Sequence, residues 1–120
     1  MGYNSKKLAQ ELVEKGMADN GLIAWGQNSS GLLGAVGAII APMHVISKVG
    51  NLIVVTPFSN KQIFFEKAIA YKKENMINAK LKGGLFGASL KLEMKSGKTY
   101  KYSIIQGKAE LKQMLKELGF

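Results

Sequence analysis

The side chains that could perform acid–base or metal chemistry are few in this 120-residue chain, and they are scattered. His44 is the one histidine and lies among apolar residues, Asp19 is the one aspartate, and cysteine is absent. Glu66, Glu74 and Glu93 stand apart, each near lysines. A catalytic triad, a carboxylate dyad or a metal cage needs several such groups at one place. We therefore expect a satisfied or partly buried His44 imidazole, no enzymatic activity, no cofactor and no metal site.

The basic residues of the chain could make contact with anions. All seventeen basic residues are lysine, against eight acidic residues, so the net charge is +9. Because arginine is absent, an anion would meet single ammonium charges or backbone N–H groups instead of bidentate forks. The charge is concentrated in residues 61–108, which hold eleven lysines and three glutamates. The elements that this segment forms therefore decide where an anion could bind.

Residues 76–104 have the alternation of three antiparallel strands with one buried face. The apolar face consists of Ile77, Ala79, Leu81, Phe86, Ala88, Leu90, Leu92, Met94, Tyr100, Tyr102 and Ile104. Ser96 and Gly97 suit the turn between the last two strands. The opposite face carries Lys80, Lys82, Lys91, Lys95 and Lys101, which are the candidate surface for an anion or a lipid.

This lysine-rich face has three interpretations, in order of preference: a solvated surface, a surface for anionic membrane, and a surface for nucleic acid. At an anionic membrane each lysine contributes about 1 kcal/mol. Nucleic acid is the least expected partner, because parity turns Tyr100 and Tyr102 inward and leaves no outward aromatic pair for base stacking.

Two amphipathic helices are predicted, one at each end of the chain. The first, within residues 4–17, carries Leu8, Leu12 and Val13 on one face. The second, within residues 107–120, carries Leu111, Met114, Leu115 and Leu118 at i, i+3, i+4 and i+7. We expect residues 1–20 to form a helix packed on a domain of residues 21–120.

Strands are also predicted upstream of the lysine-rich segment. GLIAWGQ (21–27) and NLIVVTPF (51–58) are apolar, and Pro57 is expected to stop the second one. Successive short strands followed by a single helix favour a bent antiparallel barrel or a sandwich. The fold class expected is therefore mainly β with added helices.

Three segments resemble the bacterial pleckstrin-homology-like (PH-like) domains: LIVVTPFSNKQIFF, INAKLKGGLFGASLKLEMKSGKTYKYSI and AELKQMLKEL. The resemblance covers about residues 21–120. It implies a bent antiparallel barrel of about seven strands in two nearly orthogonal sheets, capped by a C-terminal helix, with the N-terminal helix as an addition. Phosphoinositide-binding members carry basic residues between their first two strands, whereas here no lysine lies between Lys15 and Lys48. Inositol phosphate recognition at that position is therefore not expected.

The stretch SSGLLGAVGAIIAPMHVIS (29–47) is uncharged and close to the length of a membrane span. Its glycines and Pro42 dilute the hydrophobicity, so a span is the least favoured of three interpretations. The second is a glycine-rich loop followed by a strand APMHVIS (41–47). The third is an exposed apolar loop, 31–41, that docks on lipid or on another copy of the chain. Its candidate interaction residues are Leu32, Leu33, Ile39 and Ile40.

The functional hypothesis from the sequence is a non-enzymatic PH-like binding or assembly module. It would act through self-association, with a homo-oligomer expected, or through another protein. The alternative is a peripheral binder of anionic membrane lipid that uses the lysine-rich face and the apolar loop 31–41. The expected location is the cytoplasm, or in the alternative the inner face of the membrane.

Overall fold

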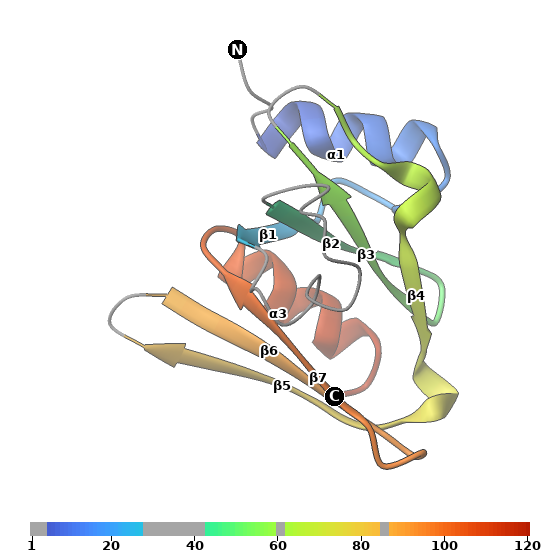
Figure 1. The fold of residues 1–120 in the computed structure, drawn as a ribbon, viewed down its shortest axis with the longest axis vertical. Coiled ribbons are helices and arrows are strands. Elements are labelled where there is room, and N and C mark those ends of the chain that lie inside the picture. Colours follow the sequence, from blue (N-terminus) through green and yellow to red (C-terminus); the bar gives the residue numbers. More distant parts are fainter. Residues whose placement is uncertain (1–4, 28–42, 60–61, 85–86) are drawn as a thin grey trace, which may run out of the picture.

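The computed structural model describes residues 5–27, 43–59, 62–84 and 87–120 (Figure 1). Its elements, in chain order, are α1 (Ser5–Glu14), β1 (Ala24–Gln27), β2 (Met43–Val49), β3 (Leu52–Phe58), η2 (Phe65–Lys67), β4 (Ile69–Lys72), η3 (Lys73–Asn75), β5 (Met76–Gly84), β6 (Gly87–Met94), β7 (Thr99–Ile104) and α3 (Lys108–Glu117). The two η elements are short 3-10 helices.

The uncharged stretch 29–47 is described in part. Its residues 43–47 belong to β2, in agreement with the strand predicted for APMHVIS. The candidate interaction residues Leu32, Leu33, Ile39 and Ile40 lie outside the described residues. Within the described ranges, no helix is long and apolar enough to cross a membrane.

All seven strands of the described residues pair antiparallel, in two sheets. The first sheet has the order β1-β2-β3-β4 and the second has the order β5-β6-β7. The predicted mainly β architecture with a C-terminal helix is therefore confirmed. The predicted barrel is not closed in the described part, because β4 and β5 are edge strands of different sheets. Figure 1 shows these two edges diverging from η3, which joins them.

The larger hydrophobic core lies between the two sheets and α3. It includes Ala24, Ile46, Ile53, Val55, Tyr71, Met76, Ala79, Leu90, Leu92, Tyr102, Ile104, Leu111, Met114, Leu115 and Leu118. The four residues of the predicted α3 stripe are all buried in it. The inward face predicted for β6 and β7 is confirmed as well, since Leu90, Leu92, Tyr102 and Ile104 are buried.

A second core lies between α1 and the other face of the first sheet. It contains Leu8, Ala9, Leu12, Ala18, Ile23, Val45, Phe58 and Ile63. Consecutive residues of β2 therefore serve different cores, Val45 toward α1 and Ile46 toward α3. The prediction that Val13 belongs to the buried stripe of α1 is wrong, because Val13 is 41% exposed. The helix buries the stripe around Leu8 and Leu12, and Val13 lies beyond its flank.

The alternation predicted for residues 76–84 fails at its first member. Met76 pairs with Met94, and Asn78 pairs with Glu93, so Ile77 is an extra residue at a β-bulge. The bulge leaves Ile77 64% exposed and puts Met76 into the core instead. From Asn78 onward the alternation holds, with Ala79 buried and Lys80 exposed.

Pro57 does not stop β3, which continues to Phe58. The Phe64 N–H donates to the Pro57 carbonyl oxygen at 2.9 Å. The missing N–H of Pro57 therefore faces the side of β3 on which β4 would pair. Since β4 pairs only with Leu52–Val55, no ladder bond is lost at Pro57.

The two sheets meet through β1 and the end of β7. The Trp25 N–H donates to the Gln106 carbonyl at 2.8 Å, and the Ile105 N–H donates to the Trp25 carbonyl at 2.8 Å. The next residue of β1, Gly26, has no room for a side chain, because a Cβ there would lie 2.0 Å from the Ser103 carbonyl oxygen. A glycine at this position therefore permits the close approach of the two backbones.

Candidate anion-binding face

The register of the second sheet puts three lysines in a row. Lys80 of β5 is opposite Lys91 of β6, and Lys91 is opposite Lys101 of β7. Lys82 belongs to the next row, opposite Ser89, which is opposite Ser103. We call Lys80, Lys82, Lys91 and Lys101 the lysine face. Three of them are exposed, and Lys91, on the central strand, is half-buried.

The lysine face carries more positive than negative charge. Neighbouring strands lie about 4.8 Å apart, and like charges directly opposite each other destabilise an antiparallel pair. The carboxylate of Glu93 partly relieves this charge, with 3.9 Å between Lys80 Nζ and Glu93 Oε1. Both side chains are partly exposed, so this ion pair contributes at most about 1 kcal/mol. An anion bound at this row would therefore reduce the repulsion between Lys80, Lys91 and Lys101.

Lys95, the fifth lysine predicted for this surface, lies one residue beyond the end of β6. It follows β6 in the turn toward β7, and its N–H donates to the Asn75 carbonyl at 2.9 Å. Lys95 lines a hollow of about 410 Å³, together with Asn51, Leu52, Lys72, Lys73 and Glu74. We call this the basic hollow. Whether Lys95 acts together with the other four lysines stays a prediction.

Sequence reasoning missed Lys72 and Lys73 as partners of Lys95. The signal available was a pair of consecutive lysines at the end of a predicted strand. They line the same hollow as Lys95 because the connection from β4 through η3 to β5 lies beside the turn between β6 and β7. Strand alternation carries no information about that arrangement.

His44 is buried, as its apolar neighbours predicted, with 1% of its surface exposed. Its Nε2 lies 2.9 Å from the Ser103 carbonyl oxygen, so this nitrogen carries the proton and donates. The ring packs edge-on against Tyr102, with 5.2 Å between centroids. Burial lowers the pKa of His44, and the bond to Ser103 offsets only part of that effect. The imidazole therefore links β2 to β7 in its neutral form.

Two buried tyrosines extend this polar contact inside the core. The hydroxyl groups of Tyr71, from β4, and Tyr102, from β7, are hydrogen-bonded to each other. Burial raises the pKa of both hydroxyl groups, so both stay protonated at neutral pH. Tyr100 packs against the Tyr71 ring with 5.1 Å between centroids. The two hydroxyl groups therefore satisfy each other's hydrogen-bonding capacity inside the core, as buried polar groups require.

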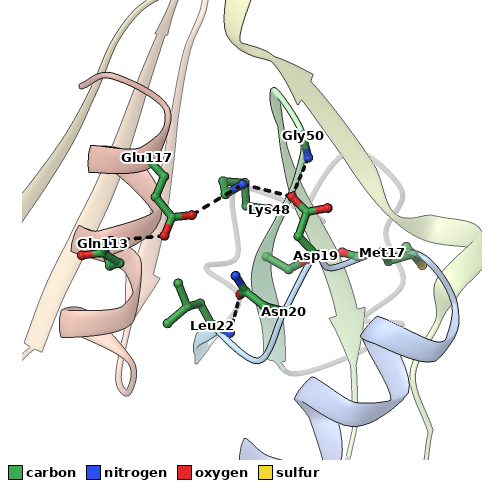
Figure 2. Close-up of polar contacts among 9 residues, drawn as sticks. Met17, Asp19, Asn20, Leu22, Lys48, Gly50, Gln113 and Glu117 are labelled. Carbon is green, nitrogen blue, oxygen red and sulfur yellow. Dashed lines mark hydrogen bonds and ion pairs between the residues drawn. The ribbon is translucent and has the colours of Figure 1, made fainter.

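A second polar cluster joins three parts of the chain at Lys48 (Figure 2). Lys48 Nζ lies 3.0 Å from an oxygen of Asp19 and 3.6 Å from an oxygen of Glu117, which belongs to α3. The same Asp19 oxygen accepts the Gly50 N–H at 2.8 Å. These contacts, first the Gly50 N–H and then Lys48, hold the pKa of Asp19 below its ordinary value.

The Asp19 carboxylate thus has a structural role in the fold. It connects the segment after α1 to the β2–β3 turn. The Ser47 hydroxyl makes a further connection, between the same segment and β2, because it donates to the Met17 carbonyl at 2.6 Å. In the residues that the structure describes, no three His, Cys, Asp or Glu side chains come together as a metal site would need.

The chain shows no significant match to any family model, to any curated protein or to any solved structure.

Proposed function

We propose that this chain is a non-enzymatic PH-like binding module that docks on anionic membrane surfaces through its lysine face. The order of elements supports the PH-like part of the proposal. A four-stranded antiparallel sheet is followed by a three-stranded one and by a C-terminal helix buried against both. The proposed location is the cytoplasmic side of the inner membrane.

The observation that carries the choice of partner is the row Lys80–Lys91–Lys101 across three neighbouring strands. A row of point charges on a sheet suits many phosphate groups spread over a surface better than a single bidentate ligand. At about 1 kcal/mol for each lysine, three of them contribute about 3 kcal/mol to membrane binding. That is roughly a hundredfold in affinity.

Nucleic acid suits this face less well. The side chains that share it with the four lysines are polar and short or acidic: Asn78, Ser89, Glu93, Thr99 and Ser103. Base stacking on aromatic side chains supplies much of the affinity for single strands. None of the residues of this face is aromatic.

Self-association through Leu32, Leu33, Ile39 and Ile40 stays a second proposal, based on the sequence. The lysine face bears on it in one way. Two such faces brought together would repel each other. A homo-oligomer would therefore bury another surface and leave the lysine face free for membrane.

The test is sedimentation with phosphatidylcholine vesicles that contain or lack phosphatidylglycerol. We expect the parent chain to sediment with the anionic vesicles and to be released as salt screens the charges. The variant with Lys80→Gln, Lys91→Gln and Lys101→Gln should bind roughly a hundredfold more weakly. It should also unfold at higher urea concentration, because the cross-strand repulsion is removed.

The matched control carries Lys6→Gln, Lys112→Gln and Lys116→Gln. These three lysines are exposed on α1 and α3, and the control has the same net charge as the first variant. We expect it to bind nearly as well as the parent. Equal losses in the two variants would show that net charge alone attracts the chain and would overturn the role of the lysine face.

A further inference from the structure

The basic hollow is built where three connections of the fold converge. Asn51 comes from the β2–β3 turn and Leu52 begins β3, while Lys72 to Glu74 come from the end of β4 and η3. Lys95 comes from the turn between β6 and β7. The hollow therefore collects lysines from both sheets, at the point where the chain crosses from one sheet to the other.

The backbone around the hollow is held in place by hydrogen bonds. The Lys73 N–H donates to the Asn51 carbonyl at 2.8 Å, and the Lys95 N–H donates to the Asn75 carbonyl at 2.9 Å. Lys72 is paired with Leu52 in the first sheet. The arrangement of the three connections is thus fixed before any ligand arrives, which reduces the entropy lost on binding.

The three lysines of the hollow differ in what they already contact. Lys73 Nζ lies 6.0 Å from the centroid of the Phe120 ring, and it is also close to Gly119. Its ammonium group therefore serves the C-terminal end of α3, where positive charge is favourable. Among the described residues, neither Lys72 nor Lys95 forms an ion pair.

We propose that the basic hollow binds a phosphate monoester, with Lys72 and Lys95 as its charged contacts. A concave site that gathers three lysines and one glutamate favours a compact ligand of high charge density. A phosphate monoester carries a charge of about −1.5 to −2 at neutral pH on three strong acceptor oxygens. This site is separate from the lysine face, and its binding does not depend on the membrane proposal.

The test is a titration of the isotope-labelled chain with inorganic phosphate, followed by NMR at constant ionic strength. We expect saturable shifts of the amide signals of Asn51, Lys73 and Lys95. The variant with Lys72→Gln and Lys95→Gln should bind phosphate at least about tenfold more weakly, since it loses two charge-assisted contacts. Shifts in the parent that grow linearly without saturation would mean only general screening and would overturn the proposal.

Two further variants separate the site from alternatives. Glu74→Gln removes the one acidic side chain of the hollow and should strengthen phosphate binding, a gain that misfolding cannot produce. Lys6→Gln with Lys112→Gln removes the same charge at exposed positions of α1 and α3 and should leave phosphate binding unchanged. If this second pair weakens binding as much as Lys72→Gln with Lys95→Gln does, the hollow is not the site.

A phosphate monoester could belong to a lipid headgroup or to a free metabolite. Sedimentation with vesicles that contain phosphatidic acid, compared with phosphatidylglycerol, distinguishes the two, because only the first presents a monoester. A preference for phosphatidic acid that Lys72→Gln with Lys95→Gln abolishes identifies the lipid as the source. Saturable binding of glycerol 3-phosphate without that preference identifies a free ester. The absence of both results would overturn the proposal.

Discussion

Single buried polar residues hold the two sheets of this protein together. His44 of β2 donates to the carbonyl oxygen of Ser103 in β7, and its ring contacts Tyr102. The Tyr102 hydroxyl in turn bonds with that of Tyr71, from the edge strand of the other sheet. Because each group is buried, loss of one partner leaves the other unsatisfied, at about 1–3 kcal/mol.

The buried imidazole makes the stability of the fold depend on pH. The unfolded chain binds a proton at His44 near pH 6.5, whereas burial holds the pKa lower in the folded chain. The contribution of His44 is therefore complete above about pH 6.5. It is lost as the pH falls below that value, by at most about 1.4 kcal/mol per pH unit, until the folded pKa is reached.

Asp19 also has a lowered pKa in the folded chain, but its contribution to stability is lost only below about pH 4. The pH dependence between pH 7 and pH 5 is therefore expected to come from His44.

Urea unfolding at pH 7, 6 and 5 measures the part that belongs to His44. We expect the free energy of unfolding of the parent to fall over this range. In His44→Gln, whose amide can still donate to Ser103, the fall should be smaller although the variant is less stable at pH 7. The same pH dependence in both proteins would contradict this account of His44.

At the scale of elements, the alternation of strands and the spacing of helices correctly predicted the buried faces that depend on local sequence alone. The inward residues of β6 and β7 and the buried stripe of α3 are where their spacing puts them. Local patterns failed where a distant contact decides the outcome. Ile77 is exposed because of a bulge against β6, and β3 accommodates Pro57 because β4 does not pair there.

The candidate site was predictable to a similar extent. Parity along each strand identified the outward lysines Lys80, Lys82, Lys91 and Lys101. The row formed by three of them depends on the register between strands, which parity does not fix. The sequence pattern did not show that β6 ends one residue before Lys95. The basic hollow was not predictable, since its residues come from three connections far apart in sequence.

The junction between β1 and β7 is an element-scale feature that one substitution tests. In Gly26→Ala the new Cβ would lie 2.0 Å from the Ser103 carbonyl oxygen, which belongs to backbone that cannot easily move. We expect a loss of about 1–3 kcal/mol or more in the free energy of unfolding by urea. Gly21→Ala is the control, because nothing lies within 4 Å of a Cβ there and its φ is not positive. Equal stability of the two variants would show that the sheets do not depend on this close approach.

At the scale of the whole molecule, charge and apolar surface are distributed differently. The described part carries the lysine face and the basic hollow on the second sheet and at the crossing between the sheets. The exposed large apolar side chains there come from five different parts of the chain: Val13, Ile69, Ile77, Ile105 and Phe120. Scattered apolar residues of this kind are normal on a monomer surface. For self-association the sequence offers a separate candidate, the uncharged stretch with Leu33 and Ile39.

The last prediction concerns that self-association. Leu33 and Ile39 stand among glycines in a stretch with no charge, and soluble monomers rarely expose a contiguous apolar patch of more than a few hundred Å². We expect light scattering at moderate salt to report a homo-oligomer, with a symmetric dimer as the commonest form. Leu33→Ser with Ile39→Ser should give a smaller species that still unfolds cooperatively. The matched control, Ile77→Ser with Ile105→Ser, removes two isoleucines that are 64% and 54% exposed and should leave the size unchanged. A parent that is monomeric at every concentration, or a control that dissociates equally, would show that this stretch does not join copies of the chain.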